Sequence, residues 1–237
     1  LDVGCDCGLV TCFIAQQYPE CRVVGVDKNE LAVNNAKALA ERLGLSNVEF
    51  VTADIYDFVL DEKASVATSF RGLLDIAQKQ TSGVSVIGER SKRENAYQQA
   101  FSPLATAIAN NLTDDGAVIS VERYTALYGW LGWMQALAEA GVSPVMDKCA
   151  RMVAQDISTK KDYSVTFAQK SSKSTPLEAY NYVMEQNFKS GAGVTGADAE
   201  FSLYFDSTGI EFTDVKKGEK LIHQFAKAES KGGKFMF

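Results

Sequence analysis

The chain has 237 residues, 46% of them hydrophobic and 23% charged, which is the balance of an ordinary folded protein. A chain of this length builds a full core without disulfide bonds, and it amounts to one large domain with or without a small extension. This composition excludes disorder, collagen-like repeats and coiled coil, while the net charge of −6 disfavours nucleic acid as a partner and no apolar run is long enough to span a membrane.

The chain opens on the end of a strand, residues 1–3, followed by a glycine turn over residues 4–8. A helix with Val10, Phe13 and Ile14 on one face is expected next, and Pro19 ends it. Because the first residue already belongs to a strand, we expect further sequence upstream of it. The last four residues likewise look like an interrupted strand.

Two more strands follow in quick succession. Residues 22–26 form a short apolar run typical of a buried parallel strand, which ends at Asp27. Asn29 can cap a helix that continues to Leu43, and Gly44 suits its C-terminus. Residues 48–51 predict a third strand. The alternation of strands and helices predicts a doubly wound α/β sheet.

Acidic residues accompany each of these strands: Asp2 precedes the glycine turn, Asp27 ends the second strand and Asp54 follows the third. Ligands of open parallel sheets bind beyond the carboxyl ends of the strands, where an acid can accept hydrogen bonds from a ribose diol. The pattern therefore predicts an adenosine-containing cofactor. The glycine spacing, Gly4 and Gly8 with Asp6 between them, disfavours a nicotinamide dinucleotide, whose fingerprint is G-x-G-x-x-G.

Residues 2–8 (Asp-Val-Gly-Cys-Asp-Cys-Gly) resemble the first motif, D-x-G-x-G-x-G, of the class I S-adenosylmethionine-dependent methyltransferases. Residues 23–27 and 48–54 are similar to the second and third motifs of that family. The resemblance implies S-adenosyl-L-methionine as the cofactor. It would be held by the following residues: Asp2, Gly4, Asp6 and Gly8 of the turn, Asp27 at the ribose with Lys28 beside it, Asp54 at the adenine amino group, the Ile55 backbone facing the ring, and Ser69.

Asp6 departs from the family pattern, because most members carry a glycine at this position. Its carboxylate either obstructs the cofactor or accepts a hydrogen bond from the cofactor's amino group. Aspartate tolerates positive φ better than most residues, so the turn itself need not break. We expect the second outcome.

The middle of the chain would complete the sheet. Residues 64–68 predict a fourth strand, with Ser69 and Arg71 at its carboxyl end, and residues 117–122 a fifth strand after a turn at 114–116. A helix is expected to start at Ser102 and Pro103, and the polar stretch 81–101 is either a solvated surface or a lid. Glu122 is the candidate acid or base, and Tyr124 and Arg71 are candidates to orient substrate.

Further on, an apolar helix is expected to stop at Gly141, and a hairpin of residues 145–154 with 163–168 would supply the sixth and seventh strands. The resemblance implies a doubly wound, mostly parallel seven-stranded sheet whose last strand is antiparallel. We assign residues 1–170 to this methyltransferase-like domain and residues 171–237 to a small, incomplete C-terminal α+β extension.

The extension should contain a helix over residues 175–188, a strand over 210–215 and a short helix around Leu221, Ile222 and Phe225 that carries His223. Residues 201–205 alternate as in a strand, although Thr195 and Asp198 have capping-box spacing for a helix. The G-x-G-x-x-G of residues 191–196 follows a helix instead of a strand, so we interpret it as a turn.

The leading interpretation is a cytoplasmic S-adenosylmethionine-dependent methyltransferase with a small-molecule or protein acceptor. The alternative is a non-catalytic binding or scaffolding module of the same fold, which Asp6 favours. The odd number of cysteines, five, indicates reduced intracellular thiols, and their spacing does not match a metal site. The oligomeric state and the acceptor are not encoded in any motif.

Overall fold

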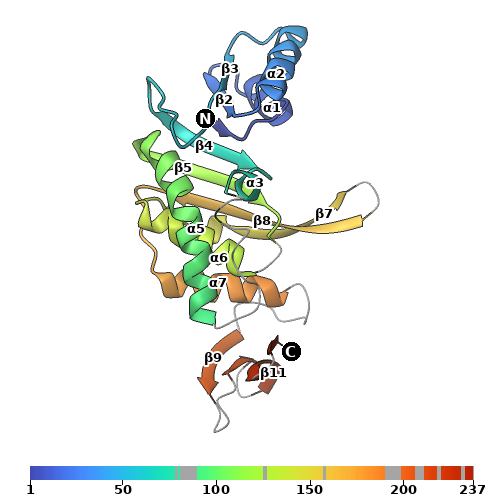
Figure 1. Cartoon of the computed structure of the whole chain (residues 1–237), viewed down its shortest axis with the longest axis vertical. Helices are drawn as coiled ribbons and strands as arrows, with labels where there is room; N and C mark the ends of the chain where they lie inside the picture. The colour runs from blue at the N-terminus through green and yellow to red at the C-terminus, as the bar shows by residue number, and fades with distance from the viewer. Residues whose placement is uncertain are drawn as a thin grey trace.

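The computed structural model describes residues 1–77, 80, 90–124, 127–156, 159–189, 199–205, 211–217, 220–230 and 233–236. An eight-stranded sheet, shown in Figure 1, forms its centre with the order β3-β2-β1-β4-β5-β8-β6, and β7 pairs with β8. The strands are β1 (Asp2–Val3), β2 (Val23–Asp27), β3 (Val48–Thr52), β4 (Ala64–Phe70), β5 (Leu112–Glu122), β6 (Ser143–Pro144), β7 (Ala150–Asp156) and β8 (Thr159–Gln169).

The pairing from β3 to β5 is parallel, whereas β8 runs antiparallel to β5, β6 and β7. The predicted doubly wound, mostly parallel sheet with an antiparallel last strand is therefore confirmed, with eight strands where seven were expected. The helices are α1 (Leu9–Gln17), α2 (Glu30–Leu43), α3 (Leu73–Ile76), α5 (Arg90–Asn110), α6 (Leu127–Glu139) and α7 (Pro176–Lys189), with a short 3₁₀ turn at Met146–Lys148.

Local sequence explains the ends of α2. The Asn29 side chain accepts hydrogen bonds from the amides of Leu31 and Ala32, as an N-cap residue does. At the other end Gly44 has φ +66°, the left-handed conformation that glycine adopts without strain. Both expectations for this helix are confirmed.

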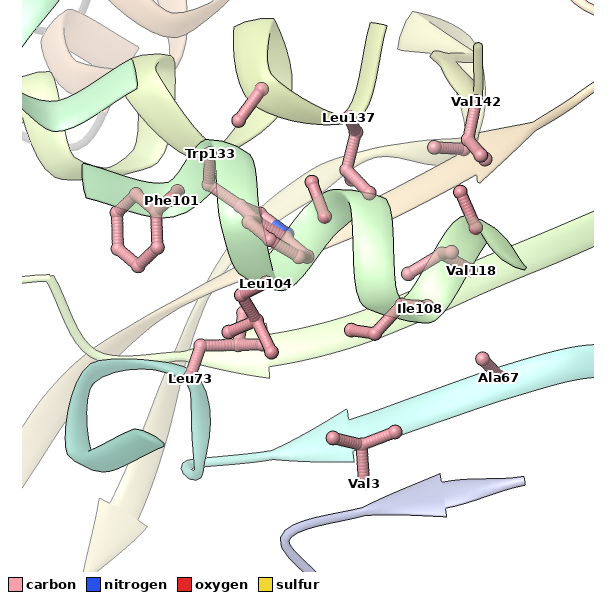
Figure 2. Close-up of a cluster of buried hydrophobic side chains, with 14 of the residues drawn as sticks. Val3, Ala67, Leu73, Phe101, Leu104, Ile108, Val118, Trp133, Leu137 and Val142 are labelled. Atoms are coloured by element: carbon pink, nitrogen blue, oxygen red, sulfur yellow. The ribbon is translucent and has the colours of Figure 1, made fainter. Parts of the chain in front are cut away.

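Two apolar clusters cover the sheet on opposite faces. One joins α1 and α2 to β3 through Cys12, Val33 and Phe50. The larger cluster packs α3, α5 and α6 on the strands, where Val3, Ala67 and Val118 lie beneath the helical side chains (Figure 2). Because successive residues of a strand point to opposite faces, the neighbour of Val3, Asp2, faces α1.

Several details of the expected helices are corrected. The helix expected to start at Ser102 begins at Arg90, with Pro103 inside it, and the Ser102 hydroxyl donates to Glu139 of α6 at 2.7 Å. The buried face of α1 consists of Thr11, Cys12 and Ala15, whereas the side chain of Phe13 is 60% exposed. Of the expected face, Val10 and Ile14 are half-buried and only Phe13 is exposed. Hydrophobicity could not predict the burial of Thr11, whose hydroxyl donates to Asp2.

The expected turn at residues 114–116 lies within β5. The register with β4 jumps there: Ala64 pairs with Leu112 and Val66 with Ala117, so β5 carries a bulge that replaces a separate turn.

After β8, α7 confirms the helix expected over residues 175–188. It packs on α6 in a third apolar cluster that includes Trp130, Leu131, Ala179 and Val183. The boundary expected at residue 170 stays a prediction, and this contact across it provides a direct test.

The last described residues form a four-stranded antiparallel sheet of β9 (Ala199–Phe205), β10 (Glu211–Lys217), β11 (Lys220–Ser230) and β12 (Gly233–Met236). The alternation over residues 201–205 is confirmed as a strand, and so is the strand expected near 210–215. The short helix expected around Leu221 is wrong, because this segment belongs to β11, where it pairs with β10. The G-x-G-x-x-G segment and residues 81–89 of the expected lid lie outside the described residues.

Candidate functional site

A cavity of about 570 Å³ opens at the carboxyl ends of β1, β2, β3 and β4. Its volume lies within the range of small-molecule sites, roughly 300–1,000 Å³. The wall is built from four segments that follow these strands, since parallel strands bring their carboxyl ends to one edge of the sheet.

The glycine turn after β1 forms the first wall. Gly4, Asp6 and Gly8 all have positive φ, of +72°, +47° and +75°. Of these, Gly4 and Asp6 line the cavity. Gly8 serves packing instead: a Cβ atom there would come within 2.7 Å of the Ala36 side chain and 2.8 Å of Phe50.

Asp27 at the end of β2 is held by backbone amides. Its Oδ2 accepts the N–H of Asp6 at 3.0 Å and its Oδ1 accepts the N–H of Asn29 at 2.9 Å. Lys28 and Asn29 line the cavity beside it. Two amide donors fix the carboxylate in one orientation at the wall, with lone pairs left for a ligand.

The segment after β3 supplies Asp54, Ile55 and Tyr56. Asp54 Oδ1 accepts the N–H of Tyr56 at 3.1 Å, an Asx-type turn that presents the carboxylate at the wall. The Ile55 side chain is buried, and the Tyr56 hydroxyl is buried without a hydrogen-bond partner. Burial, and to a lesser degree the charge of Asp54, raises the pKa of Tyr56.

The fourth wall follows β4 and contains Arg71, Gly72, Asp75 and Ile76. It lies against the glycine turn, because a Cβ atom on Gly4 would come within 3.0 Å of Ile76 Cδ1 and 3.7 Å of Gly72 Cα. Arg71 has φ +59°, an uncommon conformation for a side chain of this size, and its N–H donates to Val121 O at 2.8 Å.

Charge is unevenly distributed over the described lining. Carboxylates come from four residues and cations from two: Asp6, Asp27, Asp54 and Asp75 against Lys28 and Arg71. The Asp6 carboxylate has the Cys7 thiol as its hydrogen-bond donor, at 3.6 Å. An excess of negative charge in a concave wall favours a cationic ligand over an anionic one.

Asp2 and Ser69 lie behind the wall. Asp2 is 3% exposed, and its carboxylate accepts the hydroxyls of Thr11 at 2.6 Å and Thr68 at 2.9 Å. Burial raises the pKa of Asp2, and the two threonine hydrogen bonds oppose that rise. Ser69 is 1% exposed and donates to Val3 O at 2.9 Å. Both residues tie β4 to β1, and Asp2 also ties β1 to α1.

Of the three candidates for acceptor chemistry, Arg71 lines the cavity and the other two do not. Glu122 is 3% exposed and accepts backbone N–H groups from Arg123 at 2.8 Å and Leu74 at 3.4 Å. Burial raises the pKa of Glu122, against these amide hydrogen bonds. The Tyr124 hydroxyl is buried without a partner, and its pKa is raised well above the usual value by burial and by the charge of Glu122.

Sequence reasoning missed Tyr56, Gly72, Asp75 and Ile76 as parts of the wall. Tyr56 lies two residues after Asp54, and the other three follow the fourth strand directly, so position relative to a strand end was the available signal.

The five cysteines all lie among the described residues. All five are free thiols, and burial raises the pKa of Cys5 to about 12. The described part of the chain contains no group of three or more His, Cys, Asp or Glu side chains that could hold a metal ion.

Comparison with known proteins gives a match along most of the chain. The sequence profile of a family described as "Methyltransferase domain" matches residues 1–169. Over 62 residues the chain is 36% identical to (S)-tetrahydroprotoberberine N-methyltransferase of Eschscholzia californica. This alignment covers 26% of this chain and 18% of that protein. Over 145 residues it is 28% identical to the release factor glutamine methyltransferase of Buchnera aphidicola, covering 57% of this chain and 46% of the relative.

The chain thus aligns with less than half the length of either relative. Among solved structures, the magnesium protoporphyrin IX methyltransferase of Synechocystis PCC 6803 with bound SAM superposes with a TM-score of 0.51 at 17% identity, covering 72% of this chain and 68% of that one. At this identity the superposition shows a shared fold and nothing finer. Across the described residues, none of the helices has the length and apolar character to cross a membrane.

Proposed function

This chain belongs to the class I S-adenosylmethionine-dependent methyltransferase family, and from that premise we propose that it binds S-adenosylmethionine in the cavity and transfers the methyl group to a small-molecule or protein acceptor. The observation that supports this most directly is the Asp27 carboxylate, fixed at the wall by the amides of Asp6 and Asn29. A fixed carboxylate at the end of the second strand suits two neighbouring hydroxyl groups of a ribose.

The rest of the wall fits the same cofactor. Asp54 would accept the adenine amino group, and the apolar residues Val26, Ala53 and Ile55 would contact the ring. The turn at Gly4 would receive the amino-acid part, where Asp6 would accept from its ammonium group. Lys28 lies next to the ribose position.

Charge separates this cofactor from a nicotinamide dinucleotide. S-adenosylmethionine carries a sulfonium and an ammonium group, whereas a dinucleotide carries a pyrophosphate. Carboxylates outnumber the two cations of the wall; they belong to Asp6, Asp27, Asp54 and Asp75. This excess of negative charge attracts the cationic groups of S-adenosylmethionine and repels the pyrophosphate of a dinucleotide.

The bound cofactor would supply a methyl group on a positive sulfur, which is already an excellent leaving group. The protein's task is then to position the acceptor and to exclude water. Arg71, at the wall, is the residue that we assign to orient the acceptor. Tyr124, whose hydroxyl is buried without a partner and does not line the cavity, is not assigned this role.

The proposal also covers the acceptor and the location of the protein in the cell. One relative is named for a tetrahydroprotoberberine nitrogen and another for a release factor glutamine, so relatives act on both small molecules and proteins. The five free thiols support a reducing compartment such as the cytoplasm.

A non-catalytic module of the same fold is the second candidate. Two observations favour it: Asp6 replaces the family's glycine, and neither Glu122 nor Tyr124 lines the cavity. This module would bind cofactor, or no ligand, without methyl transfer.

Isothermal titration with S-adenosylmethionine, S-adenosylhomocysteine and NAD tests the proposal. We expect the first two to bind and NAD not to bind. Radiolabelled methyl transfer to a fractionated small-molecule and protein extract then separates the enzyme from the module. Absence of binding by both adenosyl compounds would contradict the proposed cofactor, and binding without any transfer would favour the module.

A further inference from the structure

Glu122 is buried at the end of β5, yet its carboxylate is directed at backbone amides and not at the cavity. Its Oε2 accepts the N–H of Leu74 at 3.4 Å and its Oε1 accepts the N–H of Arg123 at 2.8 Å. Leu74 lies in the first turn of α3, whose N-cap residue is Gly72. Glycine has no side chain with which to cap a helix, so the amides at the start of α3 need another acceptor.

α3 is also part of the cavity wall. Arg71 and Gly72 immediately precede it, and Asp75 and Ile76 lie on it. On its other side Leu73 is fully buried in the main apolar cluster, where Figure 2 shows it beside the α5 residue Leu104. The wall is therefore a short segment between the cavity and the core.

The end of β5 holds this segment at three successive points. Phe70 pairs with Val121 in the sheet, the Arg71 N–H donates to Val121 O at 2.8 Å, and the Leu74 N–H faces Glu122. The second and third contacts straddle Gly72, which touches the glycine turn. Arg71, which makes the second contact, has φ +59°.

We propose that Glu122 is a positioning residue that fixes the wall of residues 71–76 by accepting the amides of α3, and that it is not an acid or base for the acceptor. This inference rests on the proposed function only where it concerns cofactor binding. A base would have to reach the acceptor, and Glu122 does not line the described cavity. Its role is exerted through Leu74.

The test compares the unaltered 237-residue chain with Glu122→Ala, Glu122→Gln and Glu122→Asp. Ser120→Ala is the matched control, because Ser120 is equally buried on the same face of β5. Its hydroxyl oxygen accepts the Trp133 Nε1–H at 2.9 Å, away from the wall. Amide hydrogen exchange over residues 72–77 measures how firmly α3 is held in place. Titration with S-adenosylhomocysteine measures the affinity of the cavity for this ligand.

We expect Glu122→Ala to accelerate exchange over residues 72–77 and to weaken S-adenosylhomocysteine binding, each by about tenfold, as expected for loss of a hydrogen bond to a charged group. Glu122→Asp should behave likewise, because its shorter side chain does not reach Leu74. Glu122→Gln keeps one acceptor oxygen and should lie between Glu122→Ala and the wild type. Ser120→Ala should lower the melting temperature without either local effect.

Unchanged exchange and unchanged binding in folded Glu122→Ala, Glu122→Gln and Glu122→Asp would overturn the positioning role. Should Glu122→Ala fail to fold, the Gln and Asp variants carry the same comparison. If the wild-type chain itself does not bind S-adenosylhomocysteine, the proposed function fails, and exchange in the free protein still decides whether Glu122 holds α3.

Discussion

The carboxylate of Asp27 accepts the backbone N–H of Asp6 at 3.0 Å, which joins the turn after the first strand to the end of the second. The residue that departs from the family's glycine pattern is thus tied by its backbone to the acid assigned to the ribose. Asp6 itself has φ +47° and lines the cavity.

Asp27→Ala is expected to weaken S-adenosylmethionine binding by about 1.5–3 kcal/mol, since hydrogen bonds to a charged group are lost. Titration of the folded variant measures this. Asp61→Ala, an exposed aspartate outside the cavity wall, removes the same charge and is the control. Equal affinities for Asp27→Ala and Asp61→Ala would refute the ribose assignment.

Asp6→Gly separates the two roles open to the Asp6 carboxylate. We expect weaker S-adenosylmethionine binding, with the larger effect at low salt, because a charge that meets the cofactor's ammonium is removed. Asp6→Asn is the partner variant, since asparagine also tolerates positive φ but carries no charge. Tighter binding by Asp6→Gly, by about tenfold or 1.4 kcal/mol, would instead show that the side chain obstructs the cofactor.

Thr11→Val tests whether Asp2 serves the fold and not the ligand. The hydroxyl of Thr11 is a buried donor to the Asp2 carboxylate at 2.6 Å, and valine keeps its shape without donating. The free energy of unfolding should fall by about 1–3 kcal/mol in chemical denaturation. Cofactor affinity should stay the same, and a selective loss of affinity would return Asp2 to the binding site.

Stability should depend on pH through Glu122. Burial raises its pKa in the folded chain, so the folded state keeps this proton to higher pH than the unfolded state does. The stability contribution is therefore complete below the ordinary carboxyl pKa near 4.5 and is lost as the pH rises through the raised value. Glu122→Gln should flatten the decline above pH 4.5. Asp2, whose pKa is raised as well, is present in both proteins and cancels from the comparison.

Two shortened chains test the boundary at residue 170. The expectation of a separable extension predicts that a chain ending at Lys170 stays folded. The packing of Ala179 and Val183 on Trp130, together with the edge contact of Tyr182 with Trp130 at 5.8 Å, predicts exposure of apolar surface in that chain. We expect it to melt lower and to aggregate, whereas a chain ending at residue 189 remains monodisperse by light scattering. Equal melting temperatures and equal monodispersity of both chains would support the boundary at residue 170.

By itself, the sequence determined the first half of the sheet and the general place of the cavity. Short apolar runs each followed by an acid, Asp27 and Asp54, predict strand ends, and parallel strands place their carboxyl ends at one edge. The caps of α2 at Asn29 and Gly44 are equally local, so their chemistry could be recognised without any tertiary information.

Which of the acids faces the cavity was decided by strand register. Asp2 pairs with Gly25, two residues before Asp27, so it lies inside the sheet and points at Thr11 of α1. The spacing of Asp2 to the glycine turn matches the family motif whether its side chain faces the cavity or α1, so the motif alone could not decide. Side-chain direction alternates along a strand, and only the neighbouring strand shows at what depth a residue stands.

The tertiary structure also decided the fate of residues far apart in the chain. The Glu122 carboxylate accepts the N–H of Leu74, which lies 48 positions away in the sequence. Tyr56, Asp75 and Ile76 line one cavity because the segments that follow β3 and β4 both form its wall. A sequence pattern reports periodicity within one element, whereas a hydrogen bond between the end of one strand and the helix after another depends on how the elements pack. For this reason Glu122 could be recognised as a residue at a strand end, but its partner could not.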